Sequence, residues 1–167
     1  MAAIKDRNTQ PELLIRRSLH SRGFRFRLHV QKLPGKPDLV FPKFGAVLFV
    51  NGCFWHGHDC SMFRWPTTRP EFWRVKIGGN VTRDLRNEDA LAALGWRVGV
   101  IWECALKGPR RQPLCDMIDT LCSFLESSEK QFSIQGQTLD RFSDQTIRSD
   151  AGAGGDPLLR KTSLPER

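Results

Sequence analysis

The segment LPGKPDLVFPKFGAVLFVNGCFWHGHDC, residues 33–60, contains the features that decide the fold. It opens with a turn rich in proline and glycine, which delivers Asp38 to the start of a short apolar strand at residues 39–41. After a second turn, the uninterrupted apolar run at residues 46–50 is typical of a central strand that is buried on both faces. We expect residues 51–69 to follow as a long loop, whose first part is dense in cysteine and histidine.

Helical and strand-like patterns flank this segment. Thr9-Gln10-Pro11-Glu12 matches a capping box with proline early in the helix, which predicts that a helix begins there. Apolar spacing predicts helices over residues 10–22, 70–77, 80–95 and 114–125, a break at Gly78-Gly79, and strands over residues 24–30 and 96–102. Strands that alternate with helices in this order predict an α/β fold, a sheet covered by helices.

The length of 167 residues suits one domain, which we assign to residues 1–133. From residue 134 onward the apolar periodicity fades, so we expect residues 134–167 to form a disordered tail. Residues 1–133 hold 21 Lys/Arg and 13 Asp/Glu and therefore carry the whole formal net charge of +8. Such a domain attracts phosphate and favours a nucleic acid partner, although a plain basic surface explains the charge about equally well.

The distribution of apolar residues and cysteines bears on the cellular compartment. No run of about 18 apolar residues is present, and the N-terminus lacks the apolar core of a signal peptide. Five cysteines, an odd number, fit poorly with a secreted disulfide framework. We therefore expect a cytoplasmic protein with no membrane partner. Cys115 and Cys122 fall in the predicted C-terminal helix, where we expect them to be buried small hydrophobic residues.

Two thiols and two imidazoles lie within eight residues, at Cys53, His56, His58 and Cys60. Ligands of these types at this density suit a tetrahedral zinc site, and Cys104, which follows a predicted strand, is a good further ligand. The spacing leaves open which histidine binds the metal, and it also leaves open that the cysteines are merely buried. A site closed by four protein ligands has no position for water, so such a zinc ion would be structural and the chemistry would lie elsewhere.

Asp38 follows a proline at the edge of a predicted strand. In the restriction-endonuclease-like fold, an aspartate placed in this way holds Mg²⁺ against the scissile phosphate. A Pro-Asp pair more often begins an ordinary strand, so Asp38 indicates a nuclease only in combination with other motifs.

The combination of motifs resembles the very-short-patch-repair (Vsr) endonuclease family. The resemblance is carried by residues 1–4 (MAAI), 9–12 (TQPE), 33–38 (LPGKPD), 49–56 (FVNGCFWH), 71–73 (EFW), 76–78 (KIG), 80–81 (NV), 83–84 (RD), 94–98 (LGWRV) and 102–106 (WECAL). It spans about residues 1–108 with consistent spacing, and the tail has no counterpart in it.

The resemblance implies a restriction-endonuclease-like mixed sheet flanked by helices, with a structural zinc site. It also implies a single-domain nickase that acts on double-stranded DNA with a T·G mismatch and cuts 5′ to the thymine, in very short patch mismatch repair. The implied cofactors are catalytic Mg²⁺ and structural Zn²⁺. We accordingly expect a monomer associated with the nucleoid, for which other mismatch-repair proteins are candidate partners.

The resemblance also implies roles for single residues. Asp38 and the main-chain carbonyl of Val50 match the Mg²⁺ contacts, and His56 matches the histidine that activates water. Asp84 matches the residue that orients this histidine, and Glu12 matches a glutamate beside the active site. The residues that match the zinc ligands are Cys53, His58, Cys60 and Cys104. The family pattern therefore assigns one histidine to the metal and the other to the chemistry.

Asn51 departs from the best-known family pattern, which has histidine before Gly-Cys. An amide can hydrogen-bond phosphate or water but cannot carry a proton. We keep Asn51 among the catalytic candidates in this restricted sense. Family members also usually have a longer basic segment ahead of the position of Met1.

Several residues are candidates for contact with DNA. Phe54 and Trp55 match aromatic residues that enter the base stack beside a mismatch, and Met1 matches a wedge residue of the N-terminal arm. Unstacking costs less at a weak base pair, although aromatic residues more often pack as core. Core positions are expected for Trp73, Trp96 and Trp102. Candidate phosphate contacts, each of which also fits a solvated charge, are Arg25, Arg27, Lys32, Lys36, Arg64 and Arg69.

Two other functions have to be separated from mismatch nicking. One is a restriction or transposition nuclease of the same fold that ignores mismatches. The other is a zinc-stabilised DNA-binding module without catalysis, for which Asp38, His56 and Asp84 would be present by accident.

Overall fold

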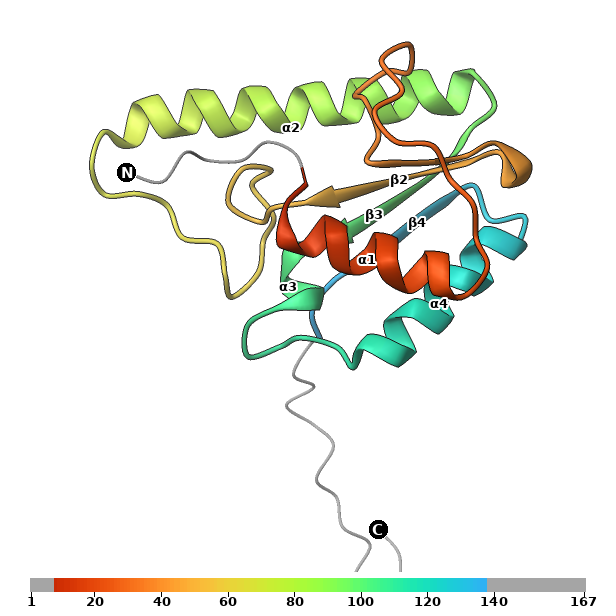
Figure 1. Ribbon diagram of the computed structural model, residues 1–167. Helices are drawn as coiled ribbons and strands as arrows, with labels where there is room; N and C mark the ends of the chain where they lie inside the picture. Colours follow the sequence, from red (N-terminus) through yellow and green to blue (C-terminus); the bar gives the residue numbers. More distant parts are fainter. Residues whose placement is uncertain (1–7, 138–167) are drawn as a thin grey trace, which may run out of the picture.

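The computed structural model describes residues 8–137, which form a four-stranded mixed sheet with helices on both faces (Figure 1). The strands are β1 (Leu39–Phe41), β2 (Ala46–Asn51), β3 (Arg97–Trp102) and β4 (Gln131–Ile134), in that order across the sheet. β1 runs antiparallel to β2, whereas β2, β3 and β4 are parallel to one another. The predicted α/β fold, a mixed sheet flanked by helices, is confirmed.

Three long helices cover the two faces of the sheet. The helices are α1 (Gln10–Ser21), α2 (Pro70–Ala93), α3 (Glu103–Leu106) and α4 (Leu114–Glu126), with a 3-10 helix η1 (Pro42–Phe44). α1 and α4 cover one face, where Ile15, Leu48 and Leu121 are fully buried in one apolar cluster (Figure 1). α2 covers the other face, where Leu91 packs with Val47. Burial of each such side chain stabilises the fold by about 1.5–3 kcal/mol.

Parallel pairing of β2 and β3 brings two distant segments to one edge of the sheet. Asn51 at the end of β2 is paired with Trp102 at the end of β3. The loop with Cys53 and the helix with Cys104 therefore start from neighbouring strand ends. Because β1 is antiparallel to β2, Asp38 at its N-terminal end lies at this edge too. The carboxyl ends of parallel strands are the usual place for a site in an α/β protein.

The prediction of a strand over residues 24–30 is wrong. These residues form a single bridge, between Arg27 and Val40. His29 has a φ of 55°, a left-handed conformation that interrupts extended backbone. Phe24 is buried while Leu28 is exposed, so the alternation in the sequence reflects partial burial of an irregular segment.

The predicted break at Gly78-Gly79 is also wrong, because α2 runs continuously from Pro70 to Ala93. Each glycine costs a helix interior about 1 kcal/mol relative to alanine. Contacts between α2 and the loop at residues 52–60 supply stabilisation that the local propensity lacks. Asn80, where the second of the two predicted helices would begin, therefore lies inside α2.

The prediction for the N-terminal end of the described chain is confirmed, whereas the C-terminal end differs from the one expected. α1 starts with the predicted capping box between Thr9 and Glu12. β4 was not predicted, and the boundary expected after residue 133 falls inside it, because Ile134 is buried as its last residue. Met1 and residues 138–167 of the expected tail lie outside the described residues. Within residues 8–137, none of the helices combines the length and apolar character needed to cross a bilayer.

Candidate active site and metal cluster

The loop at residues 52–60 is fixed against α2 by two contacts. Gly57 has a φ of 59°, and a Cβ added there would lie 2.9 Å from Ile77 Cγ2. Only a residue without a side chain combines that backbone with that close approach. Asn80 Nδ2 donates a hydrogen bond of 2.8 Å to the carbonyl of Trp55. His56, between these two contact points, is thereby held beside the helix.

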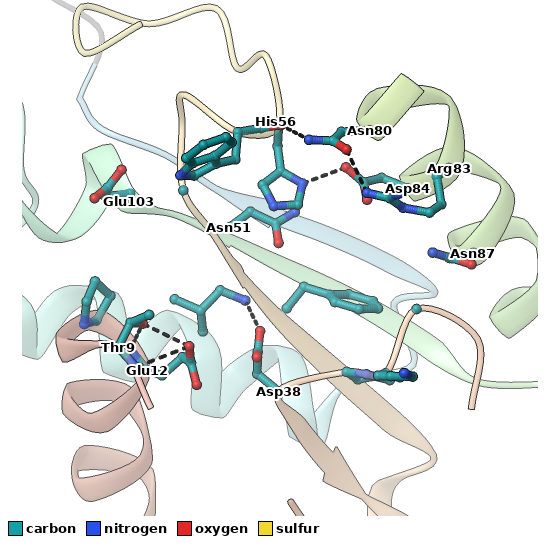
Figure 2. A pocket seen from close by; sticks show the side chains of 18 of the residues that line it. Thr9, Glu12, Asp38, Asn51, His56, Asn80, Arg83, Asp84, Asn87 and Glu103 are labelled. Carbon is teal, nitrogen blue, oxygen red and sulfur yellow. Dashed lines mark hydrogen bonds and ion pairs between the residues drawn. The ribbon is translucent and has the colours of Figure 1, made fainter. Parts of the chain in front are cut away.

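His56 forms a pair with Asp84 of α2. His56 Nδ1 and Asp84 Oδ2 lie 2.5 Å apart, and the two side chains are 26% and 24% exposed. When Asp84 accepts the Nδ1–H, the other ring nitrogen, Nε2, is left as a proton acceptor. Figure 2 shows this pair on one side of a cleft and Asp38 on the other side. The structure thus brings together the three residues on which the enzymatic interpretation depends.

The cleft has a volume of about 900 Å³. Its lining includes every catalytic candidate from the sequence, namely Glu12, Asp38, Asn51, His56 and Asp84, together with Val50. Asn51, the last residue of β2, is buried, with 8% of its surface exposed.

Asp38 is a poorly solvated carboxylate. Burial raises its pKa from the ordinary value of 3.8 to about 6, and the nearby charge of Glu12 acts in the same direction. A hydrogen bond of 2.7 Å, donated by the N–H of Val50 to Asp38 Oδ2, lowers the pKa but does not cancel the effect of burial. A bound cation would offset this cost, because it favours the charged form of the carboxylate.

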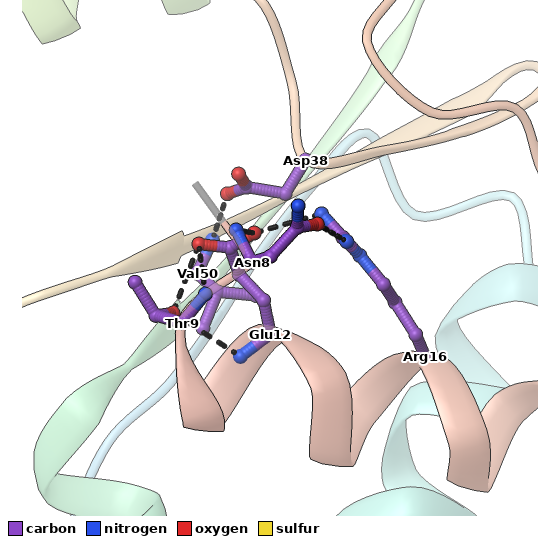
Figure 3. A network of polar contacts seen from close by, with 6 residues as sticks. All are labelled: Asn8, Thr9, Glu12, Arg16, Asp38 and Val50. Carbon is purple, nitrogen blue, oxygen red and sulfur yellow. Dashed lines mark hydrogen bonds and ion pairs between the residues drawn. The ribbon is translucent and has the colours of Figure 1, made fainter. Parts of the chain in front are cut away.

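Glu12 is held by a buried network at the N-terminus of α1 (Figure 3). Arg16 Nη2 donates to Glu12 Oε2 at 2.7 Å, and both side chains are almost fully buried. The N–H groups of Asn8 and Thr9 also donate to the Glu12 carboxylate, at 3.0 and 3.3 Å. The two carboxylates therefore have different environments: Glu12 is fully paired, whereas Asp38 is the one that a hard cation such as Mg²⁺ would suit.

A second group of side chains converges on the other part of the loop. The ligand atoms of Cys53, His58, Cys60 and Cys104 all lie within 4.8 Å of one another. In a tetrahedral site with metal–sulfur bonds of about 2.3 Å, neighbouring ligands are roughly 3.5–4 Å apart, so these side chains could hold a metal ion after small movements. Burial raises the pKa of the Cys53 and Cys104 thiols, so a cation is needed to keep them as thiolates.

Glu103 is a residue of the cleft that the sequence did not single out. Its Oε2 accepts a hydrogen bond of 3.3 Å from the N–H of Cys53, and its carboxylate also pairs with Lys107. It therefore ties the start of the cysteine-rich loop to α3. Its place in the WECAL motif was the available signal, but a glutamate next to a cysteine has no distinctive spacing.

Aromatic side chains form a group beside the cleft. The ring of Phe54 lies 5.2 Å from that of Trp55 and 5.3 Å from that of Trp73. Trp73 is half-buried in this group, so the prediction that it is a core residue is wrong. Trp102 is also half-buried, and it stacks on His58 with ring centroids 4.0 Å apart.

The basic candidates are divided by the structure. Lys36 lines the cleft, together with Lys76 and Arg83, which were not among the predicted phosphate contacts. Arg25 and Arg27 are exposed but lie outside the cleft lining. The other three basic candidates, Lys32, Arg64 and Arg69, are exposed as well.

The two remaining thiols and one tryptophan were also assigned to the core by the sequence. Cys115 is exposed and Cys122 is half-buried, so the expectation of buried thiols is wrong. α4 buries the stripe that contains Met117 and Leu121, and both cysteines fall at or beyond its edge. Trp96 is partly buried and packs against the apolar cluster under α2.

Comparison with known proteins identifies relatives of this chain. A family model described as DNA mismatch endonuclease Vsr matches residues 1–62. The type II nicking enzyme V.XorIIP of Xanthomonas oryzae pv. oryzae is 54% identical over 106 residues, which cover 64% of this chain and 78% of the relative. DNA mismatch endonuclease Vsr of Escherichia coli K12 is 47% identical over 116 residues, or 70% of this chain and 73% of the relative. With its mixed sheet and the fold expected from the motifs, the chain belongs to the Vsr family of DNA mismatch endonucleases, and with it to the DNA endonucleases.

Proposed function

We propose that this enzyme nicks double-stranded DNA 5′ to the thymine of a T·G mismatch, by Mg²⁺-dependent hydrolysis of one phosphodiester. The observation that carries the proposal is the His56–Asp84 pair, which lies in one open cleft with Asp38. The names of the relatives, a DNA mismatch endonuclease and a nicking enzyme, support both the mismatch and the cut in a single strand.

His56 is the general base of the proposed reaction. Asp84 accepts its Nδ1–H, which fixes the tautomer and leaves Nε2 to take a proton from the attacking water. The charge of Asp84 then stabilises the imidazolium that forms. A base positioned in this way typically accelerates a reaction 10²–10⁴-fold.

The proposed cation site is on the opposite wall of the cleft from His56 and Asp84 (Figure 2). Asp38 and the carbonyl of Val50 would hold Mg²⁺, with Glu12 fixed nearby. When bound, Mg²⁺ stabilises negative charge on the attacking and leaving oxygens of the phosphodiester. Asn51 orients water or phosphate by hydrogen bonding but transfers no proton. Basic side chains that line the cleft and would neutralise the DNA backbone are Lys36, Lys76 and Arg83.

The cysteine–histidine cluster would hold a structural Zn²⁺ ion. Its proposed ligands are Cys53, His58, Cys60 and Cys104. When bound, zinc fixes the conformation of the loop that carries His56, and it leaves no open position for water. The three cysteine thiolates account for the preference for zinc over a hard cation.

The aromatic group beside the cleft is the proposed mismatch sensor. Phe54 and Trp55 lie in the loop at residues 52–60, are half-buried, and pack against the ring of Trp73. A rigid aromatic wedge of this kind can enter a base stack; unstacking costs about a few kcal/mol per step, and it costs less at a mismatch. Met1, which lies outside the described residues, is proposed as a further wedge residue.

The proposal is tested by nicking of oligonucleotide duplexes that differ in one base pair. We expect a T·G duplex to be nicked roughly 10–100-fold faster than the matched T·A duplex, because the mismatch lowers an unstacking cost of about a few kcal/mol. EDTA should abolish nicking, and added Mg²⁺ should restore it. Equal rates on the two duplexes would indicate a nuclease that ignores mismatches.

Variants separate catalysis from binding in the same assay. Asp38→Ala should lose nicking while it keeps its affinity for DNA. Asp89→Ala, which removes an exposed carboxylate of α2 outside the cleft lining, is the matched control and should nick as the wild type does. Nicking by Asp38→Ala at the wild-type rate would exclude Asp38 from the catalytic site. A wild-type protein that binds DNA but does not nick it would indicate the DNA-binding module.

A further inference from the structure

The segment that follows β4 contacts the metal cluster from the far end of the described chain. His58 Nε2 lies 2.8 Å from Gln135 Oε1, and the N–H of Gly136 donates to Cys104 Sγ at 3.3 Å. These two neighbouring residues thus approach two different members of the cluster. Neither residue belongs to the motifs that carry the family resemblance.

We infer that Gln135 and Gly136 are positioning residues of the zinc site, which select the metal-binding nitrogen of His58 and fix the sulfur of Cys104. The inference rests on the zinc part of the proposed function. It concerns residues that surround the proposed ligands and adds no ligand to them.

The environment of His58 determines which ring nitrogen faces the cluster. The side-chain carbonyl oxygen of Gln135, Oε1, can only accept a hydrogen bond, so its partner, Nε2 of His58, must carry the hydrogen. The other nitrogen, Nδ1, then has a free lone pair, and it lies 3.6 Å from Cys104 Sγ. The ring also stacks on Trp102, with an angle of 11° between the two planes. The tautomer and the plane of the imidazole are therefore both set by residues outside the ligand set.

Gly136 has no space for a side chain. A Cβ added there would lie 2.8 Å from the carbonyl oxygen of Cys104 and 2.9 Å from that of Arg110, and both of these atoms belong to the backbone. This close approach is what allows the Gly136 N–H to reach the sulfur of Cys104. Hydrogen bonds from backbone N–H groups to a ligating sulfur stabilise the thiolate and orient it.

The segment is placed by contacts that do not involve the cluster. The N–H of Gln137 donates to the carbonyl of Arg110 at 2.8 Å, and the side chain of Gln112 donates to the carbonyl of Gln135. β4 itself is paired with β3 up to Ile134. The outer contacts of the metal site are therefore built in by the fold, and the ion does not have to order them.

Zinc affinity of the full chain tests the inference by competition with a chromophoric chelator. We expect Gln135→Ala to weaken zinc binding about tenfold, at the lower end of the 10–100-fold effect of such residues, because Gln135 is exposed to water. Gln135→Glu keeps an acceptor for the Nε2–H and should bind zinc at least as tightly as the wild type. Gln137→Ala is the matched control, since within residues 8–137 its hydrogen bond is made by the backbone N–H and none by the side chain, and it should leave the affinity unchanged.

A spectroscopic measurement separates the two positioning roles. In the Co²⁺-substituted protein, Gly136→Ala should shift the sulfur-to-metal absorption band, because the N–H of residue 136 is displaced from Cys104. The Gln135 variants should change metal affinity with a smaller shift of this band. Circular dichroism at 20 °C checks that each variant is folded.

The outcomes distinguish the inference from the proposed function. A wild-type protein without stoichiometric zinc would overturn both the zinc site and the inference. Zinc affinity of Gln135→Ala equal to that of a zinc-binding wild type would overturn the inference alone. Weaker zinc binding by Gln135→Ala, together with zinc binding by Gln135→Glu at least as tight as that of the wild type, would support the inference.

Discussion

His56 and His58 are separated by one residue, yet they belong to two different sites. His56 meets a carboxylate of α2, and its ring lines a cleft open to solvent. His58 meets three cysteines, stacks on Trp102 and is backed by the neutral amide of Gln135. The same side chain therefore has an anionic partner at one position and a neutral partner at the other.

The difference shows how the surroundings of an imidazole suit it to a role. A carboxylate that accepts the Nδ1–H stabilises the protonated ring, which is the form that a general base reaches when it takes up a proton. A neutral acceptor on one nitrogen favours the neutral ring with a lone pair on the other, which is the form that binds a metal. The backbone between the two residues, with the left-handed Gly57, turns the side chains toward different elements.

The largest expected effect comes from removing each imidazole in turn. His56→Ala should reduce the rate of nicking about 10³-fold while the zinc content stays stoichiometric, because it removes the base and no ligand. His58→Ala should lose zinc and lower the free energy of unfolding, and its activity should fall as a consequence. Nicking rate, zinc content and urea unfolding, measured on both variants, check the prediction. Loss of zinc from His56→Ala, or retention of stoichiometric zinc by His58→Ala, would show that the two roles have been assigned the wrong way round.

A second prediction uses the pH dependence of the cleft. The pKa of Asp38 is raised from 3.8 to about 6 in the folded state, mainly by burial, so the ionised carboxylate destabilises the fold. This cost is fully present well above pH 6, decreases as the pH falls through 6, and is absent below 3.8. Without Mg²⁺, Asp38→Asn should therefore be more stable than the wild type by about 2 kcal/mol at pH 8 and equally stable at pH 3.5.

Urea unfolding at several pH values, with and without Mg²⁺, measures this difference. Added Mg²⁺ should stabilise the wild type at pH 8 and have little effect on Asp38→Asn, because the variant lacks the charge that holds the cation. Asp89→Asn, at an exposed carboxylate, is the control and should show neither effect. An Asp38→Asn protein that is no more stable than the wild type at pH 8 would mean that the carboxylate is solvated.

The sequence predicted the sheet better than the segments around it. β1, β2 and β3 are apolar runs bounded by turn residues, so their pattern is strong. The irregular segment at residues 24–30 has the alternation of a strand, but the backbone of His29 interrupts it. β4 has only four residues, and its pairing with β3 comes from the parallel register, which no local pattern encodes.

The same distinction holds for the two sites. Density of cysteine and histidine predicts a metal cluster, and family motifs point to Asp38, His56 and Asp84, which line one cleft. The contacts of Gln135 and Glu103 could not be predicted, because they depend on chain segments that the sheet brings together. α2 was predicted as two helices because Gly78-Gly79 is unfavourable in a helix interior, whereas the packing of Ile77 and Asn80 against the loop at residues 52–60 is a tertiary contact.

The smallest expected effect tests the contact that holds His56 against α2. Gly57 and Gly45 have nearly equal φ values of 59° and 58°, so alanine is strained to a similar degree at both positions. A Cβ at Gly57 would lie 2.9 Å from Ile77 Cγ2, whereas one at Gly45 meets nothing within 4 Å. Gly45→Ala should therefore lower the free energy of unfolding by about 1 kcal/mol, and Gly57→Ala by about 1–2 kcal/mol more. Only Gly57→Ala should also slow nicking, because the loop has to move away from Asp84. Urea unfolding and nicking assays on both variants measure these effects, and equal losses at the two positions would show that the loop is held by its metal cluster alone.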